Sequence, residues 1–355
     1  RMSTPLVLGI ESSCDETAAA VVRDGRTVLS GVIASQIESH ALYGGVVPEI
    51  ASRMHVEALD YLAAEALSRA GLFMEEIDAV AVTYGPGLVG ALLTGVSWAK
   101  AFAYGRGLPL IPVNHIEGHV SANYLAHPEL EPPFVCLVAS GGHSHIVEVS
   151  RYGAYRLLGR TMDDAAGEAY DKAAKVLDLG YPGGPLIDRL AAQGDPKAYA
   201  FPRGLMGTTG KAVSAENRFN FSFSGVKTAL LYAARDRQLT STDLADLAAS
   251  FQQAVVDVLV SKTLRAAEAY GAPTICACGG VACNRQLRRD LTAAAAAAAR
   301  RLVLAEPRYC TDNAAMVAGL AYHTLRRGAV EPGGFQVAAR LGEDLGRVPF
   351  APALV

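Results

Sequence analysis

Two histidines four positions apart form the clearest metal-ligand pattern in the chain. On a helix, His115 and His119 lie on one face, where both imidazoles can bind one ion. The same spacing occurs in ordinary helix packing and capping, so the pair alone leaves both interpretations open. A zinc-protease helix needs a glutamate directly after the first histidine as general base, and Ile116 stands there instead. The pattern therefore disfavours a metalloprotease.

A site with two histidines needs a further ligand, and Asp312 is the best candidate. It lies in the segment Cys310-Thr311-Asp312-Asn313, between a predicted strand and a predicted helix. An aspartate in that position is also typical of a helix N-cap, and on the residues alone the N-cap interpretation is favoured. The identity of a bound metal stays open, because imidazole and carboxylate ligands suit zinc and iron alike.

Three turns of glycine or small polar residues follow predicted strands. They cover residues 12–16, 140–143 and 279–284. Glycine lets backbone N–H groups approach phosphate oxygens, and the N-terminus of a following helix adds positive potential. One such turn indicates little, but the three together favour phosphate or nucleotide binding. Asn284, at the end of the third turn, is also a natural N-cap for the helix after it.

Several carboxylates accompany these turns. Asp15 and Glu16 adjoin the first turn, where they can bind a metal or accept a proton, or simply be solvated. Asp171 lies on a predicted helix over residues 166–177, and Asp188 follows Gly183-Gly184-Pro185. Carboxylates beside a nucleotide often bind ribose hydroxyls, although surface helices also carry such residues without a function.

The elements that must position these residues occur in two rounds. Strands are predicted at 6–13, 18–23 and 27–35, with further strands at 79–84 and 108–113. After Glu131-Pro132-Pro133, a second round opens with strands at 134–139, 146–150 and 155–159 and ends with strands at 274–277 and 302–305. The predicted helices span 55–70, 89–104, 166–177, 186–193, 226–237 and 244–270, and two more begin at 285 and 313. The repeat predicts an α/β fold of two similar lobes with a cleft between them.

The expected lobes span residues 1–131 and 132–325, with a tail over 326–355 that packs back on the first lobe. Residues 195–224 are predicted to be an irregular surface insertion. The chain has a net charge of −3, so contact with RNA would require a local basic surface or a partner. Residues 197–237 hold seven basic and two acidic residues, which predicts an RNA-facing surface; a solubilising loop is nearly as well supported. The basic residues are Lys197, Arg203, Lys211, Arg218, Lys227, Arg235 and Arg237.

Cysteine usage and hydropathy predict the compartment. Four of the six cysteines lie on apolar or glycine-rich predicted strands, which is typical of reduced thiols. Neither a secretory leader nor an apolar stretch long enough to cross a bilayer is expected. The chain is therefore predicted to be cytoplasmic.

Eight motifs occur in order along the chain. They are GIESSCDET (9–17), YGPGLVG (84–90), HIEGH (115–119), SGGH (140–143), GEAYDK (167–172), YPGGP (181–185), FSFSG (221–225) and CTDN (310–313). Together they make the chain resemble the bacterial TsaD family of tRNA N6-adenosine threonylcarbamoyltransferases, once described as O-sialoglycoprotein endopeptidases. The resemblance runs from about Leu6 to Arg327. Ser12 replaces a frequent threonine and Asn114 a frequent histidine, and neither change removes a proposed ligand.

The resemblance implies a fold, an activity and partners. The fold is the two-lobed actin/sugar-kinase/Hsp70-like (ASKHA) fold with duplicated βββαβα cores. The activity is transfer of threonylcarbamoyl from threonylcarbamoyl-adenylate to the adenosine just 3′ to the anticodon, in tRNAs that read codons beginning with A, with release of AMP. The partners are tRNA, a TsaB-like paralogue as heterodimer partner, a TsaE-like ATPase and a TsaC-like synthase that supplies the adenylate.

The resemblance also assigns residues to roles. His115, His119 and Asp312 would ligate one divalent ion, iron or zinc, while Asp15 and Glu16 would lie at the reaction centre, with Asp15 as the predicted base. The adenylate would be bound by Val138, Ala139, Ser140, Gly141, Gly142, Asp171, Gly184, Asp188 and Asn284. Three rival functions stay open: a small-molecule kinase or carbamoyltransferase that acts without RNA, a nucleotide-binding scaffold, and a peptidase.

Overall fold

The computed structural model describes residues 4–207, 213–326, 338–340 and 345 of the chain. These residues fall into two compact units. Unit 1 comprises the described residues of Arg1–Leu130, Arg151–Tyr155 and Thr311–Val355, and unit 2 those of Glu131–Ser150 and Arg156–Cys310. The units differ from the expected lobes chiefly at residues 311–325, which were expected in the second lobe and belong to unit 1.

Unit 1 is built on a five-stranded sheet in the order β3-β2-β1-β4-β5. The strands are β1 (Leu6–Glu11), β2 (Glu16–Arg23), β3 (Thr27–Ser35), β4 (Ala79–Gly85) and β5 (Leu110–Asn114). β1, β2 and β3 form an antiparallel meander, while β4 runs parallel to β1, and β5 runs parallel to β4. The carboxyl ends of β1, β4 and β5 therefore meet at one edge of the sheet, which is where ligands bind in open α/β sheets.

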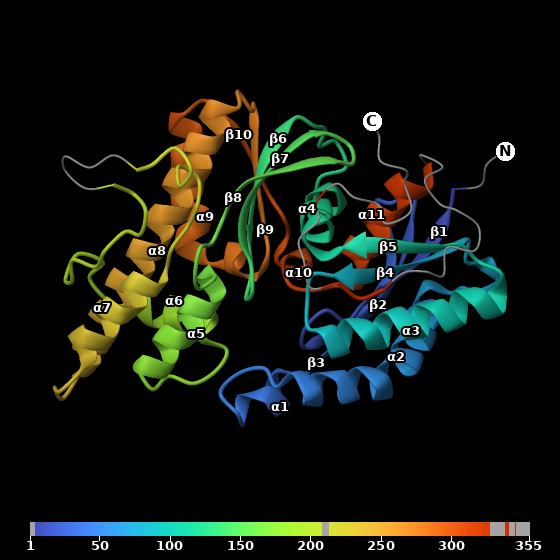
Figure 1. Ribbon diagram of the computed structural model, residues 1–355, viewed down its shortest axis with the longest axis horizontal. Helices are drawn as coiled ribbons and strands as arrows, with labels where there is room; N and C mark the ends of the chain where they lie inside the picture. Colours follow the sequence, from blue (N-terminus) through green and yellow to red (C-terminus); the bar gives the residue numbers. More distant parts are fainter. Residues whose placement is uncertain (1–3, 208–212, 327–337, 341–344, 346–355) are drawn as a thin grey trace. The chain divides into compact units, whose positions relative to one another are not determined.

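Helices cover both faces of this sheet (Figure 1). α2 (Pro48–Ala70) and α3 (Val89–Arg106) pack on one face, and α4 (His115–Ala126) and α11 (Ala314–Arg326) on the other; α1 (Ile37–Ala41) and the short 3₁₀ helix Met74–Glu76 complete the unit. Gly9 faces α11, because a Cβ there would lie 2.3 Å from the Ala314 carbonyl oxygen. Successive residues of a strand alternate between faces, so Glu11 also points toward the α4 and α11 side.

α11 explains why residues 311–326 belong to unit 1. Its buried side chains include Met316, Val317 and Leu320, and it packs against β1, β2, β4, β5 and α4. The helix follows the last strand of unit 2 along the chain, and chain order alone assigned it to the second lobe. Of the expected tail, Arg326, 338–340 and 345 are described, and the Arg340 N–H donates to the Tyr84 carbonyl at 2.8 Å. The rest of that prediction lies outside the described residues.

Unit 2 repeats the sheet topology of unit 1. Its strands, in the order β10-β9-β6-β7-β8, are β6 (Phe134–Ala139), β7 (Ser144–Arg151), β8 (Ala154–Arg160), β9 (Thr274–Cys278) and β10 (Arg301–Leu304). When this order is written from the other edge, as β8-β7-β6-β9-β10, it matches β3-β2-β1-β4-β5 of unit 1, with β6 in the place of β1. β6 pairs antiparallel with β7 and parallel with β9, as β1 pairs with β2 and β4. The predicted duplication of an α/β core is therefore confirmed.

The helices of unit 2 pack around one long central helix. They are α5 (Ala166–Val176), α6 (Gly183–Ala191), α7 (Ser224–Ala234), α8 (Ser241–Ala269), the 3₁₀ helix Gly280–Cys283, α9 (Arg285–Ala297) and α10 (Pro307–Cys310). α8 contacts α6, α7, α9, β6 and β9, and it buries Phe251, Val255 and Leu259 completely. Residues 192–207 and 213–223, between α6 and α7, form neither an α-helix nor an extended strand.

α8 also corrects one sequence expectation. By length and composition it is apolar enough to cross a membrane, although no such stretch was expected. In the structure 67% of its most apolar window is buried inside the protein. Its hydrophobicity is therefore accounted for by its position at the centre of unit 2.

Candidate functional site

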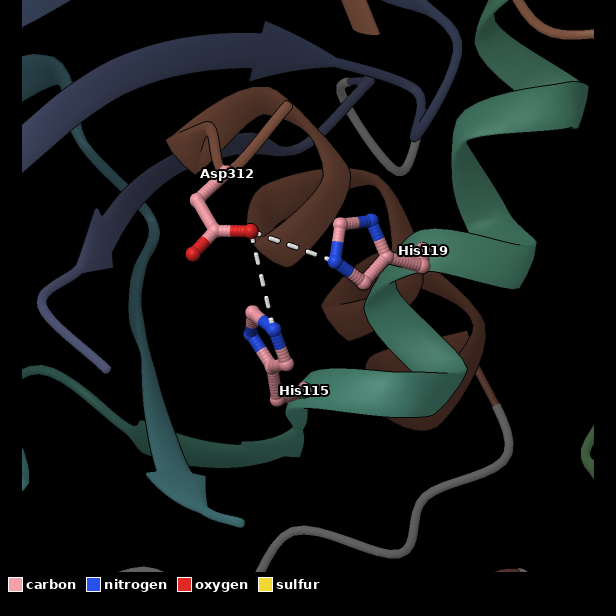
Figure 2. Close-up of side chains that lie close together, drawn as sticks. All are labelled: His115, His119 and Asp312. Carbon is pink, nitrogen blue, oxygen red and sulfur yellow. Dashed lines mark ion pairs between the residues drawn. The ribbon is translucent and has the colours of Figure 1, made fainter. Parts of the chain in front are cut away.

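The two histidines and the aspartate converge within unit 1. His115 opens α4 directly after β5, and Asn114 fixes that start because its Oδ1 accepts hydrogen bonds from the N–H groups of Ile116 and Glu117. Oδ1 of Asp312 lies 3.2 Å from Nε2 of His119 and 3.6 Å from Nε2 of His115 (Figure 2). The chain therefore brings the two histidines together with a potential ligand, Asp312, that lies nearly 200 residues later in the sequence.

Asp312 is not the N-cap of α11. Oδ1 of its neighbour Asn313 accepts a hydrogen bond from the Met316 N–H at 2.9 Å, which is the hydrogen bond that an N-cap side chain makes. The N-cap interpretation, favoured for Asp312 on the residues alone, is therefore wrong. Its carboxylate is directed at the two imidazoles instead (Figure 2).

The donor set fits a single metal ion. The three ligand atoms all lie within 4.8 Å of one another. Metal–ligand bonds of about 2.0–2.2 Å in tetrahedral geometry place two ligand atoms roughly 3.4 Å apart, close to the two distances observed. His119 is fully buried, yet neither of its ring nitrogens makes a hydrogen bond within the described residues. Because a buried polar atom without a hydrogen bond is costly, an ion bound between Nε2 and the Asp312 carboxylate would give this nitrogen a bond that the described residues do not supply.

Glu11 supports the site from behind, and sequence reasoning gave it no role. Its side chain is fully buried, and its Oε2 lies 3.3 Å from Nδ1 of His115. The same oxygen accepts a hydrogen bond from the Thr83 hydroxyl, and the Ser13 hydroxyl lies 3.1 Å from the same histidine nitrogen. A carboxylate behind a ligating histidine orients the ring and leaves its other nitrogen for the metal. The available signal was an acidic residue ending an otherwise apolar strand.

The charges around the histidines favour a cation. Burial works to lower the pKa of His115, but the carboxylates of Asp312 and Glu11 outweigh it and raise the pKa to about 9. Burial, together with the negative charges of Asp312 and Asp15, raises the pKa of Glu16 to about 10. Four carboxylates therefore act on one buried region, and a divalent ion would offset their mutual repulsion.

The loop that carries Asp15 and Glu16 is held firmly. His55, fully buried on α2, lies 3.0 Å from the Cys14 carbonyl oxygen through Nε2 and 2.7 Å from the Thr17 hydroxyl through Nδ1. Because a carbonyl only accepts, Nε2 carries the proton. The Gln36 N–H donates to the Asp15 carbonyl at 3.0 Å. Asp15 is 8% exposed, so it is not the solvated turn residue that the sequence left open.

In unit 2 the second turn lies between β6 and β7 and contacts the N-terminus of α5. The N–H groups of Gly167 and Glu168 donate to the carbonyls of Ser140 and Gly141 at 3.2 and 3.0 Å. These two N–H groups in the first turn of α5 are therefore hydrogen-bonded to the loop. Gly141 and Gly142 are exposed, and within the described ranges their own N–H groups make no hydrogen bond. These two N–H groups therefore remain available as hydrogen-bond donors.

Gly167 is the residue that allows this close packing. A Cβ at this position would lie 2.6 Å from both the Gly141 Cα and the Ser140 carbonyl oxygen. Gly167→Ala is therefore expected to cost about 1–3 kcal/mol of stability through overpacking and to weaken nucleotide binding by displacing the loop. The matched control is Gly225→Ala near the start of α7, where a Cβ meets nothing within 4 Å. Thermal melting and AMP titration of both variants test this expectation, which fails if the two behave alike.

The remaining predicted nucleotide-binding residues of unit 2 are linked by direct contacts. Gly279 has a φ of +90°, and a Cβ on it would lie 2.3 Å from the Ala139 carbonyl oxygen, so the third turn packs against the end of β6. Asp171 on α5 accepts a hydrogen bond from the Gly183 N–H at 2.7 Å, at the start of the helix that carries Gly184 and Asp188. Asp188 in turn accepts from Asn284 at 3.2 Å. Unit 2 therefore brings these predicted residues into one neighbourhood.

The predicted basic surface is largely neutralised. Arg203 pairs with Asp257 at 2.7 Å, and Lys227 pairs with Asp164 at 3.0 Å. Arg235 and Arg237 pair with Asp236 and Asp243 at 3.1 and 2.8 Å. Lys211 lies outside the described residues, and Lys197 and Arg218 are exposed. Counting charges in the window 197–237 missed the carboxylates that the fold brings from other elements. The segment's excess of positive charge is therefore smaller than the sequence indicates.

Comparisons with known proteins agree on one family. Residues 27–319 match the family model TsaD, described as tRNA N6-adenosine threonylcarbamoyltransferase. A protein of that name from Geobacter sulfurreducens is 53% identical over 341 residues, which cover 96% of this chain and 97% of the relative. Another from Symbiobacterium thermophilum is 53% identical over 328 residues, covering 92% and 94%. These lengths show that the similarity extends over both units.

Two solved structures share the fold at low sequence identity. HypF from T. kodakarensis is similar with a TM-score of 0.59 and 14% identity, over 91% of this chain and 48% of its own. Component A of the (R)-2-hydroxyglutaryl-CoA dehydratase of Acidaminococcus fermentans has a TM-score of 0.52 and 14% identity, over 91% of this chain and all of its own. At this level of identity the likeness concerns the fold alone.

Proposed function

The chain belongs to the TsaD family of tRNA N6-adenosine threonylcarbamoyltransferases, and from this premise we propose that it transfers a threonylcarbamoyl group onto the N6 amine of an adenosine in tRNA. The observation that carries the proposal is the convergence of His115, His119 and Asp312 on one point in unit 1. The spacing was ambiguous in sequence, and the geometry favours a metal centre over ordinary packing.

The metal centre is proposed to hold one divalent ion, iron or zinc. Two imidazoles and one carboxylate suit both metals. Such an ion, when bound, supplies positive charge and open coordination positions for an oxygen of the substrate. Glu11 and Ser13 hold His115 in place through its Nδ1, so Nε2 stays directed toward Asp312.

The donor is proposed to be threonylcarbamoyl-adenylate, bound by unit 2. This mixed anhydride is already activated, so the protein mainly orients it and stabilises the phosphate that leaves. The N–H groups of Gly141 and Gly142 are suited to hold phosphate oxygens. Val138, Ala139, Ser140, Asp171, Gly184, Asp188 and Asn284 are proposed to complete the nucleotide site.

Asp15 is proposed as the base in the transfer step. The adenine N6 attacks the carbamoyl carbon, the bond from that carbon to the phosphate oxygen breaks, and AMP leaves. The N6 gives up one proton, which Asp15 accepts. The adenosine proposed as acceptor is the one just 3′ to the anticodon, in tRNAs that read codons beginning with A. A base in a single-stranded loop can be splayed out at low cost.

We place the protein in the cytoplasm, with a TsaB-like paralogue as heterodimer partner, a TsaE-like ATPase and a TsaC-like synthase. tRNA binding shared with partners is consistent with the net charge of −3 and with the ion pairing of the insertion.

The decisive experiment supplies labelled threonylcarbamoyl-adenylate and tRNA to the purified chain, with and without its proposed partners. Label is expected in tRNA, at an adenosine identified by nucleoside mass spectrometry, and AMP is expected as the second product. The control is a tRNA whose acceptor adenosine is replaced by guanosine, which has no N6 amine. Label that appears only in a small molecule would favour a kinase or carbamoyltransferase on this fold. Cleavage of a glycoprotein, abolished by metal removal, would favour the peptidase.

A further inference from the structure

A buried glutamine at the centre of unit 2 organises the predicted nucleotide site. Gln252 lies on α8 and is 3% exposed. Its Oε1 accepts a hydrogen bond from Nδ2 of Asn284 at 2.7 Å. Its Nε2 donates to Oδ1 of Asp188 at 3.2 Å and to Oε1 of Gln286 at 3.1 Å. Both hydrogens of the Gln252 amide are therefore used, and one side chain connects α6, α8 and the start of α9.

The hydrogen bonds of Asn284 leave it no donor for a ligand. Its Oδ1 accepts from the Leu287 N–H at 2.9 Å and so caps α9. Its two N–H hydrogens go to Gln252 and to Oδ1 of Asp188. A side-chain amide has two donor hydrogens. Donation from Asn284 to a nucleotide would break one of these bonds, so we expect it to act through Asp188.

Asp188 keeps one acceptor position. An ionised carboxylate accepts about four hydrogen bonds, two at each oxygen. Oδ1 is filled by Asn284 and Gln252, and Oδ2 accepts from Nε of Arg285 at 2.7 Å. The Asp188 side chain is 15% exposed. Counted over the described residues, one position therefore remains, on Oδ2, which is enough for one hydroxyl donor.

We propose that Gln252 is a positioning residue that holds the Asp188 carboxylate so that its single remaining acceptor position, on Oδ2, receives one ribose hydroxyl of the adenylate. The inference rests on the proposed function and deepens it, because it assigns the recognition of the ribose to a buried network. Gln252 touches no substrate itself. It acts by donating a hydrogen bond to Oδ1 of Asp188. It also holds Asn284, which donates a second hydrogen bond to the same oxygen.

The test uses AMP as the probe and isothermal titration of the full chain. Gln252→Met keeps the size of the side chain and removes both hydrogen-bonding functions. It is expected to weaken AMP binding about tenfold, because Asp188 loses its fixed orientation. Gln252→Glu keeps the acceptor for Asn284 but removes the donor to Asp188, and a similar loss is expected. Metal content, which depends on unit 1, should not change in either variant.

A purely structural role of Gln252 would not change which ribose hydroxyl the protein recognises. Selectivity for one ribose hydroxyl therefore distinguishes a positioning role from a structural one. The measurements are repeated with 2′-deoxy-AMP and 3′-deoxy-AMP. The tenfold loss in Gln252→Met is expected to persist with one analogue and to vanish with the other, whose missing hydroxyl is the one that Asp188 receives. The control is Ser250→Ala, another fully buried polar residue of α8, which contacts Asp195 and Tyr199 rather than Asp188.

The outcomes separate this inference from the proposed function. Equal AMP binding by wild type and Gln252→Met would overturn the role of Gln252 and leave the function standing. A loss that persists with both analogues, or that Ser250→Ala reproduces, would also overturn it, because the effect would then be general destabilisation. Failure of the wild-type chain to bind AMP would remove the nucleotide site in unit 2 and this inference with it.

Discussion

Replacing His115 or Asp312 by alanine is expected to strip the bound metal from the protein. Each change removes one of three ligand atoms that lie within 4.8 Å of one another. Loss of a group behind a ligand already costs about 10–100-fold in metal affinity, so loss of a ligand is expected to lower the metal affinity by at least about tenfold and to reduce the metal content of the purified protein. Elemental analysis of the purified variants measures this directly, without an assay of activity.

The matched control is His127→Ala, which removes a half-buried histidine just after the end of α4 and leaves the three ligands intact. This control should keep the wild-type metal content. Full occupancy in both His115→Ala and Asp312→Ala would rule out the site. Circular dichroism separates loss of metal from loss of fold, because the wild-type protein stripped by a chelator provides the reference spectrum.

Glu11→Gln provides a graded version of the same test. The amide keeps the shape of the side chain but removes the charge beside Nδ1 of His115. A decrease of about 10–100-fold in metal affinity, smaller than in the ligand variants, is expected. An unchanged affinity would show that Glu11 serves only to fill its buried position.

The sequence predicted more of the fold than of the site. The two rounds of strands and helices were readable because hydrophobic periodicity is local, and the repeated strand order confirms them. The sequence did not show to which unit α11 belongs. This helix follows the strands of both units along the chain, and its unit depends on which sheet its apolar face packs against. Local patterns predict elements, whereas the assignment of an element to a unit depends on packing.

The site shows the same division more sharply. The histidine pair was visible because both residues lie on one helix. Its partner Asp312 was the best candidate for a further ligand, but only the family resemblance favoured that role over the N-cap interpretation. On the residues alone Asp312 resembled an N-cap, and the structure gives that task to Asn313. Glu11 was overlooked because a buried carboxylate is explained only by what it faces across the sheet. Lys227 appeared free in sequence because its partner Asp164 lies 63 residues away.

Asp15→Ala is expected to lose threonylcarbamoyl transfer while AMP binding and metal content stay near those of wild type. The adenine N6 is a poor nucleophile that must lose a proton, and general-base help is worth roughly 10²–10⁴-fold. The rate of threonylcarbamoyl transfer by the variant should therefore fall by about that factor in single-turnover assays with preformed adenylate and tRNA. The proposed nucleotide residues lie in unit 2, and the ligands do not include Asp15, so both binding functions should survive.

The neighbouring carboxylate makes the assignment sharper. Asp15→Asn and Glu16→Gln keep the shape of each side chain and remove one charge each. The raised pKa of Glu16 favours its protonated form, which cannot accept a further proton, so Asp15→Asn is expected to show the larger loss. Near-normal turnover in both Asp15 variants would refute the assignment, and a larger loss in Glu16→Gln would transfer the role to Glu16. A loss in Asp15→Asn accompanied by loss of metal would instead mean that Asp15 supports the ion, because a base that acts only on the substrate leaves the metal content unchanged.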